Sequence, residues 1–378
     1  MKRKYLTVLF FLLYALLINA QPVIGINKNA DNLPELFKKA FEQGKGSSSN
    51  NFWIGYGIIR NDKRSVTIGS FYDDEKYQGP SLRDLILNTK KAQVYESNAQ
   101  KRKINRTSGR IFSINCDISI NGKQNRDIET AILFLYGKDS RSIVDIRERG
   151  ICNLSGHFNL EGYPLLWLGI QDNKSSLDFL SDTFKEASKL LTKSALTAAI
   201  GIHTGEKETT DFLVNIVTGK EDAELRADAA FWLGLQNNRE ALNVLVKTVE
   251  SDHSVKVRKN AVWGIGYMEL PEALNDLIGI AKHNNVTELR KDAIYALGNK
   301  AVKKAEEALK NFIDNDPDIE IKKCAVYALA NGSGENIPYL IKIAETNPSL
   351  EIRKCAIYSL SNSDDERALN ALIKMAEQ

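Results

Sequence analysis

Apolar and polar positions follow a helical spacing through the second half of the chain, and the pattern returns at a fixed interval. The stretches VRKNAVWGIG, LRKDAIYALG, IKKCAVYALA and IRKCAIYSLS each combine a basic pair, a small-residue patch and one aromatic residue. The residues that close such patches are Gly169, Gly201, Gly234, Gly266, Gly298, Ala330 and Ser361. Their spacing of 31 to 33 residues is typical of stacked helix pairs. We therefore predict an α-solenoid of about seven units over residues 159–378.

The recurring aromatic residue falls on an unexpected side of the first helix of each unit. At about 100° per residue, Val257, Ala261 and Ile265 form the apolar stripe, and Trp263 lies about 160° from its centre. The residues at or behind this position are Phe231, Trp263, Tyr267, Tyr295, Tyr327 and Tyr358. The lysines one turn earlier on the same side are Lys259, Lys291, Lys323 and Lys354. These side chains are candidates for binding a protein or an extended peptide in a concave groove. Alternatively, the rings stack on each other and on lysine stems without any ligand.

The basic pairs carry a resemblance to a known family. They are Leu225–Arg226, Val257–Arg258, Leu289–Arg290, Ile321–Lys322 and Ile352–Arg353. This pattern, followed by alanines and a leucine–glycine, resembles the HEAT-repeat family in its short bacterial form. The resemblance implies a solenoid in which Arg226, Arg258, Arg290, Lys322 and Arg353 form a structural ladder with acids and carbonyl groups. The family pattern has an acid six residues before the arginine, and Asp252 and Asp316 match it. The ladder is expected to be incomplete, because the other units have Asn284, Asn347 and Lys220 at that place.

The N-terminal third has strand patterns instead. Residues 51–158 are predicted to form a β-rich domain of about five strands, with NFWIGYGIIR and SVTIGSFY as a hairpin and SRSIVDIRER as a strand. Residues 21–50 contain the amphipathic stretch LPELFKKAFEQ and then GKGSSSNN, a flexible linker by composition.

The first twenty residues are predicted to be a secretory signal peptide. A basic start, MKRK, precedes an apolar run that ends at Ala20; an uncleaved membrane anchor is the alternative. Without residues 1–20, the 51 basic residues become 48, equal to the 48 acidic ones. An exported, formally neutral protein is not expected to bind nucleic acid. We predict a periplasmic or secreted location.

Candidate chemistry is sparse. Cys116 and Cys152 could form a disulfide after export, whereas Cys324 and Cys355, at equivalent positions of neighbouring units, are expected to stay free. No nucleophile, phosphate-binding or metal-ligand motif is present, and we expect neither a metal nor a cofactor. A catalytic pair of Cys152 and His157 has little support. The basic segment 90–110 is a solvated loop or a contact for an anionic envelope surface.

Three functions compete. The favoured one is a non-enzymatic, protein-binding scaffold of the cell envelope that holds its partner in the solenoid groove. HEAT-like enzymes such as bilin lyases and an alkylpurine DNA glycosylase are the enzymatic alternative, disfavoured by export. A purely structural envelope protein is the third.

Overall fold

The computed structural model divides into two compact units, Met1–Thr204 and Gly205–Gln378. It describes residues 23–25, 32–62, 66–68, 81–87, 118–120, 126–156, 158–300, 302–332 and 334–377. The predicted signal peptide, the basic segment 90–110, Cys116 and His157 lie outside these residues. Among the described helices, none has the length and apolar character needed to cross a bilayer.

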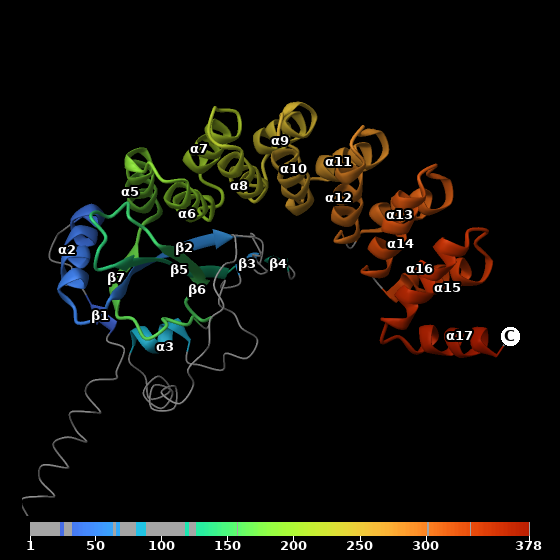
Figure 1. Cartoon of the computed structure of the whole chain (residues 1–378), viewed down its shortest axis with the longest axis horizontal. Coiled ribbons are helices and arrows are strands. Elements are labelled where there is room, and N and C mark those ends of the chain that lie inside the picture. The colour runs from blue at the N-terminus through green and yellow to red at the C-terminus, as the bar shows by residue number, and fades with distance from the viewer. Residues whose placement is uncertain are drawn as a thin grey trace, which may run out of the picture. The chain divides into compact units, whose positions relative to one another are not determined.

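The N-terminal unit is built on a mixed five-stranded sheet of order β1-β7-β2-β5-β6 (Figure 1). The strands are β1 (Val23–Gly25), β2 (Asn51–Asp62), β5 (Arg126–Gly137), β6 (Glu148–Asn153) and β7 (Leu165–Gln171). Strands β1 and β2 pair in parallel with β7, whereas β2–β5 and β5–β6 are antiparallel. A second sheet pairs β3 (Val66–Ile68) with β4 (Ile118–Ile120). The hairpin predicted after residue 60 is therefore wrong, because β2 and β3 belong to different sheets.

Both faces of the five-stranded sheet are buried. Helices α2 (Leu33–Gly46) and α5 (Asn173–Glu186) contact β2. On that side, the rings of Phe37 and Phe179 lie 4.7 Å apart and those of Phe52 and Tyr136 lie 5.8 Å apart. The other side holds the cluster around Trp53, to which the short helix α3 (Leu82–Ile86) contributes. Helix α2 thus belongs to the core, and the linker predicted after it is only a short connection to β2.

The first predicted repeat unit is wrong, because its first helix is the strand β7. Gly169 has a φ of 80°, which the α-helix does not allow. The register between β2 and β7 shifts between Gly55 and Gly57, opposite Gly169. A glycine tolerates the left-handed conformation that such a bulge requires. Gly169, which matched the repeat spacing, therefore permits the irregular pairing of β2 with β7.

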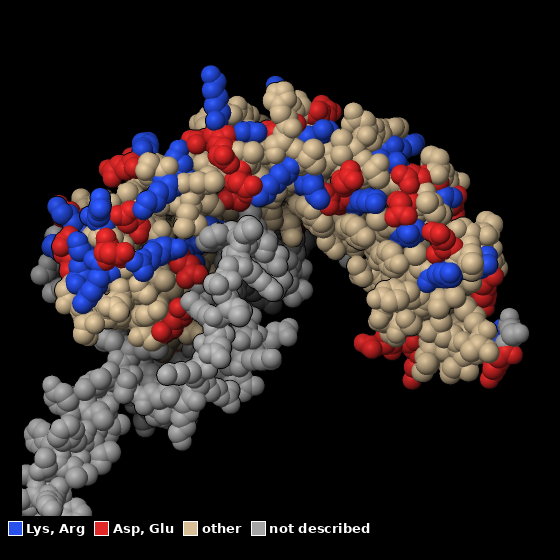
Figure 2. Space-filling view, viewed as in Figure 1, with Lys and Arg blue, Asp and Glu red and all other residues tan. Residues whose placement is uncertain are grey.

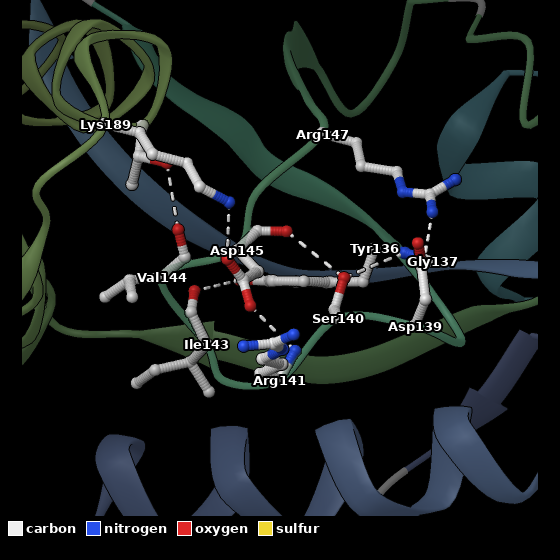
Figure 3. A network of polar contacts seen from close by, with 11 residues as sticks. Tyr136, Gly137, Asp139, Ser140, Arg141, Ile143, Val144, Asp145, Arg147 and Lys189 are labelled. Carbon is white, nitrogen blue, oxygen red and sulfur yellow. Dashed lines mark hydrogen bonds and ion pairs between the residues drawn. The ribbon is translucent and has the colours of Figure 1, made fainter.

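A polar network fixes the loop between β5 and β6 to the start of α6 (Leu190–Gly201) (Figure 3). The Asp145 carboxylate accepts from the Lys189 ammonium and the Arg141 backbone N–H, each at 2.7 Å. These contacts, led by Lys189, lower the pKa of Asp145. The Thr192 hydroxyl donates to the Val144 carbonyl at 2.9 Å. The network explains why the strand predicted at residues 140–149 begins only at Glu148.

The C-terminal unit is a solenoid-like array of helix pairs (Figure 1). After α7 (Lys207–Val217) the pairs are α8 (Ala223–Gly234) with α9 (Arg239–Ser251), α10 (Val255–Tyr267) with α11 (Pro271–His283), α12 (Thr287–Gly298) with α13 (Lys303–Asn315), α14 (Ile319–Ala330) with α15 (Ile337–Thr346), and α16 (Leu350–Ser361) with α17 (Glu366–Ala376). A 3-10 turn, η1 (Gly334–Asn336), precedes α15. Within this unit, α8, α10, α12, α14 and α16 form the inner layer of an arc and the other helices the outer layer.

Small residues set the curvature of this arc by allowing the inner helices to touch. A Cβ added to Gly234 would lie 2.3 Å from the Gly264 carbonyl oxygen, and one added to Gly298 would lie 2.7 Å from that of Ala328. Both distances are below any real contact, so only glycine permits this approach. The inner helices contact each other extensively, whereas successive outer helices touch far less. Close spacing inside and wide spacing outside bend the array toward the inner layer.

Candidate partner-binding surface

The predicted aromatic residues all lie on inner-layer helices, but their exposure differs along the array. Phe231 is buried, at 6% exposure, because Trp232 and Tyr267 pack edge-on against its ring at 5.5 Å. It therefore cannot offer the surface predicted for it. Tyr267 itself is half-buried.

The remaining rings of the position, called here the aromatic column, are Trp263, Tyr295, Tyr327 and Tyr358. The first three are half-buried, and Tyr358 is 62% exposed. They share the face of the inner helices opposite the buried stripe, which is formed in α10 by residues such as Val257. The column thus presents partly exposed rings at intervals of one repeat.

Each ring of the column except the last also contacts the following unit. The Tyr327 phenol interacts with the Cys355 thiol, and this contact together with burial raises the pKa of Tyr327 to about 12. The Tyr295 phenol lies likewise beside Cys324, and burial first and this thiol second raise its pKa to about 12. The Tyr327 and Tyr358 rings meet edge to face, with centroids 6.2 Å apart. The following unit therefore packs against each of these rings.

Asp292 lies at the position that Cys324 and Cys355 occupy in the two following units. Its pKa is raised by burial, against the effects of the Lys259 ammonium and the Trp263 side chain, which favour the carboxylate. The Lys259 Nζ lies 3.5 Å from Asp292 Oδ2. Trp263 and Lys259 thus share one acid from the next unit.

The lysine row repeats this inter-unit contact. Lys291 Nζ lies 3.9 Å from the Glu320 carboxylate, and Lys323 Nζ lies 3.8 Å from that of Glu351. In each pair the acid lies in the first turn of the next inner helix. Lys354 is exposed and forms no ion pair with any residue in the described part of the chain. The positive charge of the row is therefore largely compensated except at its end.

The structural ladder binds acids and carbonyl groups, some within a helix pair and some between pairs. Arg226 donates two hydrogen bonds to Asp252, at 3.0 and 3.1 Å, and Arg290 pairs with Asp316. Arg258 Nε donates to the Val249 carbonyl at 2.6 Å. Lys322 and Arg353 also donate to backbone carbonyls. Each acid lies 26 residues after its arginine, and Asn284 stands at that place for Arg258.

A buried hydrogen-bond chain in the N-terminal unit was not identified from the sequence. The Ser176 Oγ lies 2.9 Å from both the Tyr56 hydroxyl and the His203 Nε2. Burial lowers the pKa of His203 to about 4 and raises that of Tyr56 well above its usual value. All three side chains are sealed from solvent, so a substrate cannot reach them and the chain is structural. The only sequence signal was a histidine within an otherwise apolar stretch, AAIGIHT.

Of the two predictions about cysteines, one is confirmed and the other is not tested. Cys324 and Cys355 are buried free thiols. Cys152 is buried, but its predicted partner Cys116 is not described, so that disulfide stays a prediction. The same holds for the pair of Cys152 with His157 and for an anionic contact at residues 90–110. Within the described ranges, no three metal-ligating side chains are grouped.

Comparison with known proteins identifies the repeats. The family model for HEAT repeats matches residues 210–298 and 306–378, so the C-terminal region consists of HEAT repeats. No curated protein matches the chain. Among solved structures, it is similar to the CpcE–CpcF complex of phycocyanin lyase from Nostoc sp. PCC7120, with 18% identity, a TM-score of 0.33, and coverage of 41% of this chain and 98% of the other. It is also similar to human deoxyhypusine hydroxylase in complex with glycerol, with 18% identity, a TM-score of 0.24, and coverage of 54% and 79%.

Proposed function

We propose that this protein is a non-enzymatic scaffold that binds a protein or extended peptide along the inner layer of its HEAT repeats. The observation that carries the proposal is the aromatic column, whose partly exposed rings recur once per repeat. Large rings with few rotamers lose little entropy when they bind, and they are enriched at protein interfaces. Because the neighbouring units already hold the rings, the surface is ordered before a partner arrives.

The charges around the column favour a protein partner. Three of the four lysines of the row lie close to acids of the next unit, so the column lacks the strong positive field that nucleic acids require. On the face shown in Figure 2, basic and acidic side chains are interspersed over the C-terminal unit. A mixed amphipathic segment suits such a surface better than a polyanion.

The proposed location is the cell envelope or the exterior, and it rests on the pattern of residues 1–20. The similarity to a phycocyanin lyase, at a TM-score of 0.33, carries no argument for an enzymatic activity. A purely structural role remains the competing proposal, because the same rings also join adjacent units.

The test is capture of partners from envelope extract by cross-linking, with the full chain as bait. Tyr358→Ala is the most informative single variant, because its ring is 62% exposed and belongs to the last unit. The triple variant Trp263→Ala, Tyr295→Ala, Tyr327→Ala extends the test to the rest of the column.

A matched control replaces exposed residues of the outer layer, Glu250→Ala, Lys282→Ala and Asn311→Ala. We expect a captured protein to be lost with the column variants and retained with the control, after unfolding curves show that each bait is folded. Equal capture by all baits would assign the column a purely structural role.

A further inference from the structure

Three exposed asparagines follow the tyrosines of the aromatic column by one helical turn. Asn299, Asn331 and Asn362 come directly after α12, α14 and α16, and each lies four residues after its tyrosine. Residues four apart share one face of a helix, so these side chains extend the surface of the column. We call the three residues the asparagine row.

The turns in which the row lies do not require asparagine. Its members have φ angles of −79°, −74° and −96°, whereas asparagine is favoured after a helix where φ is positive. At the equivalent place after α8, Leu235 adopts a φ of −73°. The backbone therefore accepts a residue without a carboxamide, and the recurring carboxamides need another explanation.

The other polar groups of this surface are already engaged within the array. Two of the column's phenols lie beside thiols of the next unit, and Lys291 and Lys323 lie near its acids. By contrast, the side chains of Asn299 and Asn331 are exposed and form no hydrogen bond with another residue in the described ranges. The Asn362 Nδ2 donates to the carbonyl of the preceding turn at 3.0 Å, which leaves its Oδ1 as an acceptor.

The chemistry of the carboxamide indicates what it can bind. Its acceptor oxygen and its NH2 donor match the N–H and the C=O of a peptide group. In a helix those groups are bonded to one another, whereas a single extended segment has no such internal bonds. Neighbouring helices lie about 8–10 Å apart, and an extended chain covers this distance in about three residues. One asparagine per repeat can therefore bind the main chain of an extended segment at regular intervals.

We propose that the asparagine row binds the main chain of an extended polypeptide segment, whose side chains pack against the aromatic column. This inference rests on the proposed function and narrows its partner to an extended segment, in place of a helix or a folded surface. Because the hydrogen bonds go to peptide groups, recognition depends little on the sequence of the segment.

The probe is a fluorescently labelled pool of randomised twelve-residue peptides, which are long enough to span about four repeats. Fluorescence anisotropy measures its binding to the full chain. We expect saturable binding that the double variant Asn299→Ala, Asn331→Ala weakens at least about fivefold. Each lost hydrogen bond accounts for a factor of about two to ten.

The matched control is the double variant Asn285→Ala, Asn311→Ala. Both asparagines are exposed but lie outside the column, one between α11 and α12 and the other within α13, so binding should not change. A pool with N-methylated peptide groups should bind the native chain more weakly, because it keeps its side chains but lacks main-chain donors. Circular dichroism and thermal unfolding establish that both variants are folded.

Three results would overturn this inference: no saturable binding of the pool, equal binding by the Asn299→Ala, Asn331→Ala chain, or equal binding of the N-methylated pool. The proposed function would survive each of them if the column variants still lost their captured protein, and the partner would then be a helix or a folded surface. The proposed function fails separately, if the column variants and the outer-layer control capture the same proteins from extract.

Discussion

At the scale of single residues, the absence of a side chain matters as much as its presence. The glycine that closes several small-residue patches looks like a helix terminator in the sequence. Its function in the array is to let two inner helices approach until their backbones touch, as Gly234 does against Gly264. At Gly234 and Gly298 the packing leaves no room for a Cβ, whereas Ala330 and Ser361 carry one at the same position of later units.

Replacement of this glycine should therefore destabilise the array. We expect Gly234→Ala to lower the free energy of unfolding by about 1–3 kcal/mol, because the added Cβ would overlap the neighbouring backbone. Gly279→Ala is the matched control, since a Cβ there meets nothing within 4 Å. It should stabilise α11 by about 0.5–1 kcal/mol. Urea unfolding of both variants measures the difference, and equal effects would contradict the role of close approach.

His203 predicts a pH dependence of stability. Its pKa is near 4 in the folded protein and about 6.5 when exposed, so the unfolded chain takes up the proton first as the pH falls. The contribution of this pKa difference to the free energy of unfolding is fully present above pH 6.5. It decreases by about 3 kcal/mol as the pH falls to 4. Hydrogen exchange of α5 and α6 at a series of pH values measures this loss.

His203→Gln gives the control for that experiment. Glutamine keeps a polar group toward Ser176 but does not titrate in this range. Its stability should vary less between pH 6.5 and 4 than that of the native chain. A native-like slope in the variant would assign the pH dependence to other groups.

At the scale of elements, the repeats were predictable and the N-terminal sheet was predictable only in part. Helix spacing recurs over a long stretch, so chance matches average out. The stretch LWLGIQDNKSSLDFL matches FWLGLQNNREALNVL over the glycine, its neighbours and the helix that follows, but its first part belongs to β7. A short apolar run is compatible with a buried strand or a buried helix, and only the pairing with β2 decides between them.

The candidate site was predictable in position but not in its contacts. Angular placement located the rings on one side of the inner helices. It did not show that Phe231 is covered by Tyr267, or that Tyr327 meets Cys355, because both contacts depend on how neighbouring elements pack. The chain of Tyr56, Ser176 and His203 joins positions far apart in sequence, and no local pattern predicts it.

The structural ladder can be tested by adding the acid that one of its positions, Asn284, lacks. Asn284 takes the place of Asp252 and Asp316, and its Oδ1 accepts the same kind of turn hydrogen bond, from the Val286 N–H at 3.0 Å. We expect Asn284→Asp to retain that bond, to provide a carboxylate for Arg258, and to stabilise the array by about 0.5–1.5 kcal/mol.

The reverse change completes this experiment. Asp252→Asn removes the carboxylate that accepts two hydrogen bonds from Arg226, and it should cost about 1–3 kcal/mol. Thermal unfolding at neutral pH measures both variants. If Asn284→Asp destabilises the protein, the spacing of acid and arginine is not sufficient to form the pair.

At the scale of the whole molecule, the two units are stabilised by different kinds of contact. The N-terminal unit depends on contacts between distant segments, such as the pairing of β1 with β7. In the C-terminal unit, each helix pair contacts mainly its neighbours, so its stability is approximately a sum of unit and interface contributions. Local opening in the array should therefore begin at α17, whose buried residue is Ala368 alone.

Hydrogen exchange tests this gradient. We expect the amide groups of α17 to exchange fastest among the repeat helices and those of α10 and α12 to be the best protected. Uniform protection along the array would contradict independent nearest-neighbour contacts.

The backbone contacts between inner helices also have a mechanical consequence. Helices that already touch through glycine cannot be compressed further, whereas the sparsely packed outer helices can fan apart or close. When the arc flexes, the inner row acts as a hinge line of constant length. The distance between successive rings of the column then stays fixed while the curvature changes. A partner bound along the column, as proposed above, would therefore meet one ring per repeat at a constant spacing, whatever the curvature of the array.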